Sequence, residues 1–168
     1  FPLEQCERAK TEKIARDAAR AAAPKIDLKP IVEFLQRPLR SGLKRPKLRV
    51  LDVDGRSEIR LSVTTMGQAP GSVVVKRGYD FLGTVRPDGE VRGHLVQNED
   101  LQRVLVRVAQ DPMRAAKEYA VLMGFCCFCG KELTDDGSVD AGYGPICAKH
   151  WGLPHKALGV KTPVSVTR

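Results

Sequence analysis

The chain has 168 residues, of which 42% are hydrophobic and 29% charged, a balance typical of a globular protein. It contains no run of about 18 apolar residues, and its first 30 residues carry repeated charges, so the sequence predicts neither a membrane-spanning helix nor a secretory signal. Its five cysteines are an odd number, and three of them lie at 126–129. This pattern favours a metal site over disulfides and predicts a cytoplasmic protein.

The net charge of +8 is concentrated in the first third of the chain. Residues 1–49 carry 13 Lys/Arg against 6 Asp/Glu, whereas residues 50–168 carry 15 against 14. Concentrated positive charge attracts polyphosphates. The densest basic run, 37–49, has no acidic residue, and we predict that its cations contact nucleic-acid phosphates. These residues are Arg37, Arg40, Lys44, Arg45, Lys47 and Arg49.

Two helices are predicted near the N-terminus. Residues 3–23 are rich in Ala, Glu, Lys and Arg and contain no Gly or Pro, so they favour a helix that Pro24 ends. Its apolar stripe is thin and mostly alanine, so it buries little surface. A shorter helix is expected at 30–43, interrupted at Pro38 and closed near Gly42.

From about 47 to 96 the sequence predicts an antiparallel meander of four or five strands. Short β-branched runs alternate with turn signals that contain glycine. The segment Arg86–Gly89 is typical of a hairpin turn, with proline in its second position. Tyr79 and Phe81 lie two apart on one strand, and we expect them to pack in the core. Few other aromatics are available on the strands, so a platform for stacking single-stranded bases is not expected.

Two further helices follow. The first spans 98–110, with Asn98 as N-cap and a buried face of Leu101, Val104, Leu105 and Val108. The second begins at Asp111-Pro112, runs to about Met123 and stops at Gly124. The predicted class is α+β, divided into an N-terminal helix (1–29), an α+β domain (30–123), a zinc module (124–155) and a tail (156–168).

The segment 126–150 has the ligand spacing of a zinc site. Cys126 and Cys129 form a C-x2-C pair followed by Gly130, and after seventeen residues Cys147 and His150 form a C-x2-H pair. Two close pairs on separate elements supply the four tetrahedral ligands that structural zinc requires. We therefore predict one structural Zn²⁺ held by these four residues. A hairpin is expected at 131–141, and a helix beginning at Gly144-Pro145 is expected to present Cys147 and His150.

Alternative ligands remain open at this stage. Cys127 and Cys129 could form the first pair, although the C-x-C spacing lacks the knuckle geometry and favours Cys127 as a packed neighbour. His155 or Cys6 could replace His150 as the fourth ligand, or all the cysteines could be ordinary buried residues. We expect Trp151, which follows His150, to cover the site.

The zinc segment resembles the treble-clef zinc fold. Residues 30–155 also resemble a domain of unknown function found in bacteriophage and bacterial proteins, sometimes beside helicase-like or other DNA-metabolism modules. The C-x2-C-G knuckle, the Leu-Thr-Asp turn at 133–135 and the Gly-Tyr-Gly-Pro-x-Cys-Ala helix start at 142–148 carry this resemblance. It implies zinc binding and a nucleic-acid context, and it supplies no catalytic residue.

The sequence thus predicts a non-catalytic, phage-associated zinc protein that binds nucleic acid, DNA more than RNA. The alternative is a protein-interaction module that docks on host machinery, and a third possibility is that the charges only keep the chain soluble. A nuclease of the His-Me type needs a histidine on the hairpin, and 131–143 has none. The carboxylates Asp135, Asp136 and Asp140 fit cap and solvated positions. Nuclease chemistry stays open if His150 does not bind zinc.

Overall fold

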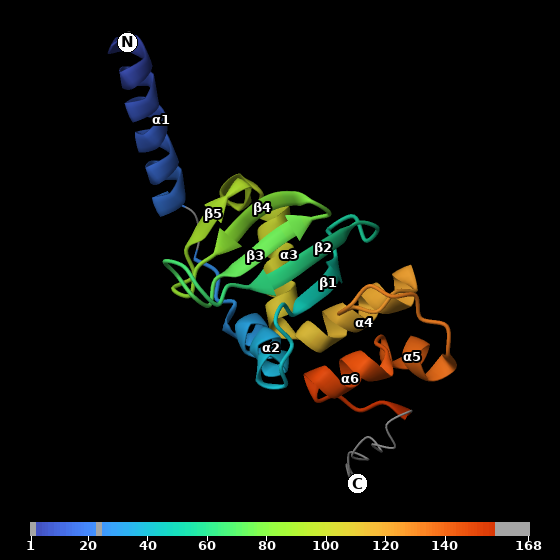
Figure 1. Cartoon of the computed structure of the whole chain (residues 1–168). Helices are drawn as coiled ribbons and strands as arrows, with labels where there is room; N and C mark the ends of the chain where they lie inside the picture. Colours follow the sequence, from blue (N-terminus) through green and yellow to red (C-terminus); the bar gives the residue numbers. More distant parts are fainter. Residues whose placement is uncertain (1–2, 23–24, 157–168) are drawn as a thin grey trace.

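The structure is a computed structural model, and it describes residues 3–22 and 25–156 (Figure 1). The helices are α1 (Leu3–Ala22), α2 (Lys29–Arg40), α3 (Glu99–Gln110), α4 (Pro112–Met123), α5 (Asp136–Ala141) and α6 (Pro145–Trp151), with a 3-10 turn η1 (His94–Gln97) before α3. The strands are β1 (Lys47–Leu51), β2 (Glu58–Val63), β3 (Val73–Arg77), β4 (Asp80–Val85) and β5 (Val91–Gly93). The predicted α+β class is confirmed.

The five strands form one antiparallel sheet in the order β1-β2-β3-β4-β5, which confirms the meander. The turn predicted at Arg86–Gly89 joins β4 to β5, and the Gly89 amide donates to the Arg86 carbonyl over 2.8 Å. In the central part of the strands, alternate residues face the helices and are buried, as at Leu48, Leu61 and Val75. In Figure 1, α3 crosses behind the sheet, and no described helix crosses in front of β2, β3 and β4.

The caps of α3 and α4 are those that the sequence predicts. The Asn98 side chain accepts a hydrogen bond from the Leu101 amide over 3.0 Å, and Asp111 accepts one from Arg114 over 3.1 Å. Gly124 ends α4 in the left-handed conformation at φ 74°. One detail differs, because α2 continues through Pro38 to Arg40 instead of breaking there. Pro38 lies in the last turn, where it removes one backbone hydrogen bond, and the helix ends two residues later at Arg40.

Most of helix α1 projects away from the rest of the fold (Figure 1), while Ala19 and Ala22 near its end line a cavity together with η1 and α3. Its described side chains are exposed, except for the half-buried Ala19. This agrees with the thin alanine stripe seen in the sequence. Pro24, which is predicted to end the helix, falls outside the described residues.

The prediction that Tyr79 and Phe81 pack in the core is wrong. Tyr79 is 100% exposed and Phe81 is 51% exposed. Tyr79 lies in the turn between β3 and β4. The register of these strands shifts between Val75 and Lys76, so Phe81 pairs with Lys76 and shares its outward face. Spacing along one strand identified a common direction and could not show this irregularity.

One hydrophobic core extends from Ile26 to Trp151. It includes Cys126, Phe128 and Tyr143 of the predicted zinc module, so the module and the α+β part pack against a common interior. Among the described residues, no helix combines the length and the apolar character needed to cross a bilayer.

Candidate metal centre

A tight knuckle at 126–130 positions the first two cysteines. Phe125 and Glu132 pair in an isolated antiparallel β-bridge, and the Cys126 amide donates to the Lys131 carbonyl over 2.8 Å. Inside this loop the Gly130 amide donates to the Cys126 carbonyl over 3.0 Å. Gly130 has a φ of 76°, a left-handed conformation that favours glycine. The predicted C-x2-C-G geometry is therefore present.

The start of α6 supplies the third cysteine. Pro145 is its first residue, so Cys147 lies in the first helical turn, as predicted. The approach to this helix is tied to the knuckle, because the Cys127 amide donates to the Gly142 carbonyl over 3.2 Å. The knuckle and the segment that precedes α6, which are separated in sequence, are thus held side by side.

The hairpin predicted at 131–141 is wrong, since residues 136–141 form the short helix α5. Asp135 is its N-cap, and its carboxylate accepts from the Ser138 amide over 2.9 Å. The hydrogen bonds from Ser138 lower the pKa of Asp135. Gly142 ends the helix at φ 87°. The Asp-Asp-Gly sequence resembles a hairpin turn, but a cap at each end of a six-residue segment stabilises a helix instead.

The sulfur atoms of Cys126, Cys129 and Cys147 all lie within 4.8 Å of one another. Zinc–sulfur bonds of about 2.3 Å in a tetrahedral site place sulfurs about 3.8 Å apart. The three thiols therefore need only a small shift to bind one metal ion. Hydrogen bonds from Cys127, from Cys147 and from the amides of Cys129 and Phe128 lower the pKa of Cys126 far below that of a free thiol. These contacts favour a thiolate at Cys126, which is the form that binds a metal, while the hydrogen bond to Cys126 raises the pKa of the Cys147 thiol.

Among the described residues, this ligand group contains the three cysteines and no histidine. His150 lies one turn after Cys147 on α6 and, with Cys129 and Cys147, lines a cavity of about 360 Å³. Its role as the fourth ligand stays a prediction.

The alternative ligands lie elsewhere. His155 is buried, and its Nε2 is 3.0 Å from the Ser138 hydroxyl. Cys6 is exposed on α1, and Cys127 is fully buried in the core beside the cluster. This placement favours Cys126 over Cys127 as the partner of Cys129.

Arg49 anchors the knuckle to the sheet. Its amide, on the edge strand β1, donates to the Cys127 carbonyl over 2.8 Å, and its guanidinium donates to the Phe128 carbonyl. The same guanidinium contacts Glu58 at 3.2 Å, and Glu58 also accepts from the Tyr119 hydroxyl over 2.8 Å. Burial opposes ionisation of Glu58, but the hydrogen bonds from Arg60 and Tyr119 outweigh it and lower its pKa. The cluster is therefore built onto the edge of the sheet.

This arrangement changes the interpretation of the basic run. Arg49 is only 8% exposed and its guanidinium is occupied, so we remove it from the predicted phosphate contacts. Arg45 and Lys47 line the cavity that contains Cys129 and Cys147. The run thus passes along the cysteine cluster. The exposed members of the run are Arg37, Arg40, Lys44, Arg45 and Lys47.

Trp151 and three other aromatic rings close the inner side of the cluster. The Trp151 and Phe128 rings stack at 4.0 Å with an angle of 15°, and Phe34 of α2 lies 5.0 Å from Trp151. Tyr143 contacts Phe128 at 5.8 Å. Trp151 is 2% exposed and also lines the cavity beside Cys147, which fits the expectation that it covers the site.

Comparison with known proteins relates the chain to one family over this module. Residues 116–152 match the model of a family of unknown function (DUF6011). The matched segment extends from α4 through α6 and contains the three cysteines and His150. No curated protein and no solved structure matches the chain. The similarity thus covers the candidate metal centre and leaves the whole five-stranded sheet outside it.

Proposed function

We propose that this is a non-catalytic zinc protein that binds nucleic acid, with one structural zinc at the cysteine cluster and phosphate contacts on the basic surface beside it. The observation that carries the proposal is the cavity of about 360 Å³, which brings Arg45 and Lys47 together with Cys129 and Cys147. The resemblance to a domain of phage and bacterial proteins favours a phage-associated protein acting on DNA in the cytoplasm.

The exposed cations of the basic run are available to a polyanion. Among the described residues, Arg37, Arg40, Lys44, Arg45 and Lys47 form no ion pair, whereas Arg49, Arg60 and Arg77 each contact a carboxylate. Unpaired like charges repel one another, and neutralising phosphates would relieve this repulsion while releasing counterions. Binding of this kind is strongly salt-dependent and has little sequence preference.

The zinc would act as a structural element. The donor set is rich in thiolates, which is typical of structural zinc, and the knuckle carries hydrogen bonds to the sheet through Arg49. When bound, the metal would cross-link the knuckle to α6 and contribute its binding free energy to folding. It would thereby fix the position of Arg45 and Lys47 relative to the module.

The proposal assigns no catalytic residue. Asp135 caps α5, and the exposed Asp140 carboxylate lies 3.9 Å from the ammonium of Lys156. Buried His155 contacts the Ser138 hydroxyl, and His94 lies on η1, outside the cysteine module. These contacts support structural and solvated roles for the groups that nuclease chemistry would need.

The test is a fluorescence-anisotropy titration of the zinc-loaded protein with single- and double-stranded DNA and RNA of one length, at several salt concentrations. We expect binding that weakens steeply with salt. Replacing Arg40, Lys44, Arg45 and Lys47 by Glu should abolish it. A matched control reverses Arg103, Arg107, Arg114 and Lys117, which changes the net charge equally but lies on α3 and α4, and should retain most of the affinity. Unaltered binding by the first variant would refute the basic-surface proposal.

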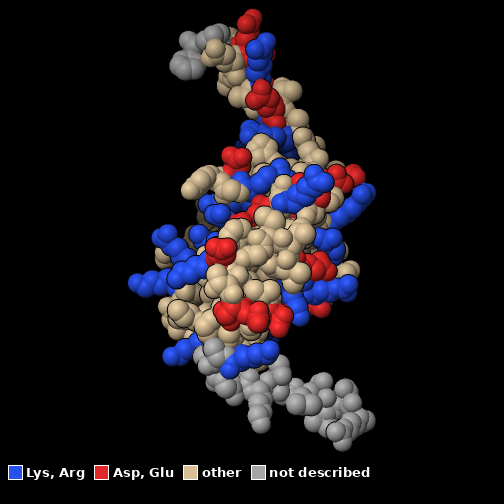
Figure 2. Space-filling view, turned by 90° about the vertical axis from the view of Figure 1, so that its right-hand side faces the viewer, with Lys and Arg blue, Asp and Glu red and all other residues tan. Residues whose placement is uncertain are grey.

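A protein partner is the second candidate, and exposed apolar side chains favour it. Val121, Leu122 and Phe125, at and after the end of α4, are exposed. Figure 2 shows a centre without charged side chains on the face of the molecule that includes α4, with Lys and Arg toward both margins and Asp and Glu below it. If no nucleic acid binds at low salt, capture from a host extract with wild-type protein and with a Leu122→Asp variant becomes the deciding experiment. Partners lost from the variant alone would support docking at this surface.

A further inference from the structure

The outward face of the sheet carries a row of cations that ends in an aromatic ring. Cross-strand pairing places Arg49 opposite Arg60, Arg60 opposite Lys76, and Lys76 opposite Phe81. Directly paired residues point to the same side of a sheet, and the strand neighbours of Arg49 and Arg60, together with Val75, are buried on the opposite side. With strands about 4.8 Å apart, the row extends about 14 Å from β1 to β4.

The two ends of this row differ in accessibility. Arg49 and Arg60 both contact the Glu58 carboxylate, so their charge is partly neutralised. Lys76 is exposed and forms no ion pair among the described residues. Beyond it, Phe81 is half exposed and Tyr79, in the turn, is fully exposed. No described helix covers this face of β3 and β4 in Figure 1.

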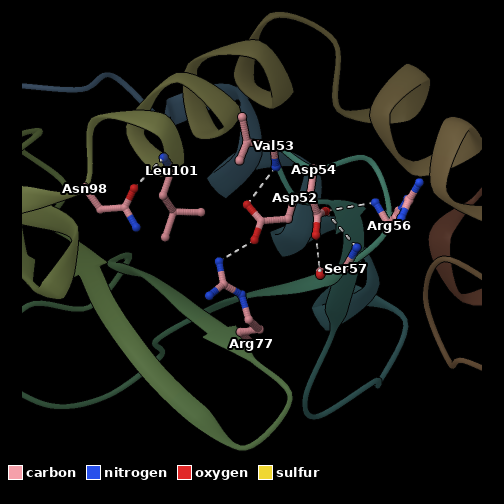
Figure 3. Close-up of polar contacts among 8 residues, drawn as sticks. All are labelled: Asp52, Val53, Asp54, Arg56, Ser57, Arg77, Asn98 and Leu101. Carbon is pink, nitrogen blue, oxygen red and sulfur yellow. Dashed lines mark hydrogen bonds and ion pairs between the residues drawn. The ribbon is translucent and has the colours of Figure 1, made fainter.

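A contact beside the turn ties the hairpin that displays these rings to the neighbouring β1–β2 loop. The Arg77 guanidinium, at the end of β3, contacts the buried Asp52 carboxylate of the β1–β2 loop (Figure 3). Asp54 in the same loop accepts hydrogen bonds from Arg56 and Ser57, which order the loop. Arg77 is therefore used for positioning, while Lys76 and the two rings remain free to contact a ligand.

We propose that the β3–β4 hairpin is a stacking surface for the bases of a single-stranded nucleic acid, with Tyr79 and Phe81 as the stacking rings and Lys76 as a phosphate contact. This inference rests on the proposed function and specifies its substrate as a single strand.

Leaving a large ring in water forfeits hydrophobic stabilisation, so two adjacent exposed rings indicate a surface that a ligand covers. A charged polymer with accessible π-faces matches both the rings and the neighbouring cation. Asp80, the acidic residue beside this turn, is paired with Arg77 in the register, so it points to the side of the hairpin opposite Lys76 and Phe81. A duplex stacks its bases internally and offers no free base face, so the surface favours unpaired strands.

Lys47, which lines the cysteine cavity, begins the strand that carries Arg49. The row therefore starts beside the basic surface of the proposed function and ends at the hairpin. One strand of nucleic acid can contact the exposed cations near the metal centre and place a base on the rings.

The experiment titrates the full-length, zinc-loaded protein with labelled dT20, rU20 and a 20-base-pair duplex. We expect single strands to bind more tightly than the duplex. Tyr79→Ala with Phe81→Ala should weaken single-strand binding by about tenfold or more, with little change in the salt slope, because stacking releases no counterions. Tyr79→Phe should retain the affinity. Lys76→Gln should reduce the salt slope by about one.

The matched control is Thr65→Ala with Met66→Ala, two exposed residues in the β2–β3 loop at the opposite end of the sheet, which should leave the affinity unchanged. Thermal melts check folding, and the single variant Tyr79→Ala, at a fully exposed position, provides the same test without Phe81. Equal single-strand affinity in wild type and the double variant would overturn this inference while leaving the proposed function intact. Tighter binding to the duplex would also overturn it. No binding of any nucleic acid at low salt would overturn both and favour a protein partner.

Discussion

The cysteine module and the β3–β4 hairpin contain similar residues and use them in opposite ways. In the module, Phe128 and Trp151 stack at 4.0 Å in the core, and Arg49 is buried against backbone and carboxylate oxygens. On the hairpin, Tyr79 and Phe81 are exposed, and Lys76 is exposed beside them.

The cause is the number of elements that cover each end of the sheet. The knuckle adds a hydrogen bond to the edge strand β1, and α2, α4 and α6 surround it, so its side chains become structural. The hairpin has the sheet on one side and solvent on the other. Whether neighbouring elements bury a side chain therefore predicts its role better than its residue type does. Four substitutions test this comparison.

Loss of the proposed zinc should have the largest effect. Cys129→Ser, or removal of zinc by a chelator, should unfold at least residues 124–152, because structural zinc contributes on the order of 10 kcal/mol in small zinc domains. Metal content and thermal melts followed by circular dichroism measure this, with Trp151 fluorescence as a local probe. Cys6→Ser, on exposed α1, is the control and should keep the zinc. An unchanged melt after chelation would refute the structural role.

Removing the Arg49 side chain should be the next most costly change. Arg49→Met leaves the Phe128 carbonyl without its donor and takes one cation from Glu58, for an expected loss of about 2–4 kcal/mol in unfolding free energy. Denaturant unfolding measures the loss. Arg45→Met removes an exposed cation of the same run and should cost less than about 0.5 kcal/mol. Similar losses in both variants would show that Arg49 does not anchor the module.

Gly130→Ala should destabilise by about 1–3 kcal/mol, since φ is 76° and an added Cβ would lie 3.0 Å from the Arg49 Cζ. Gly55→Ala is the matched control, because Gly55 has a φ of 67° and no neighbour within 4 Å of the added Cβ. It should show the backbone cost alone, about 1 kcal/mol. The difference between the two free energies isolates the close approach of Arg49, and equal values would contradict it.

The hairpin should give the smallest effect on stability. Tyr79→Ala removes a fully exposed ring, so the unfolding free energy should change by less than about 0.5 kcal/mol. Denaturant unfolding under the conditions used for Arg49→Met makes the two regions directly comparable. A loss above about 1 kcal/mol would mean that Tyr79 packs against the fold, and the contrast with the module would fail.

Local signals in the sequence predicted much of this fold correctly. Asn98, Asp111 and Gly124 were identifiable as helix caps, and alternation predicted an antiparallel meander of four or five strands, of which the structure has five. The C-x2-C-G knuckle and the Gly-Pro helix start predicted the positions of the three cysteines that come together. These features depend on residues only a few positions apart, whose preferences act in any context.

The errors occurred where distant segments decide the outcome. Asp135–Gly142 satisfies the rules for a turn and for a short capped helix, and packing of α5 against α4 accompanies the helix. The bulge at Val75/Lys76 turned Phe81 outward, and contact with Phe128 and Glu58 turned Arg49 from a surface cation into a buried anchor.

The sequence by itself determined the cysteine spacing, the order of helices and strands up to Gly124, and the concentration of positive charge before residue 50. Only the tertiary structure decided which aromatics and cations face solvent, and that Arg45 and Lys47 lie beside Cys129 and Cys147. The physical reason is that capping and alternation are set by covalent neighbours. Burial and charge pairing depend on which distant segments cover a residue, and that follows from the packing of the whole chain.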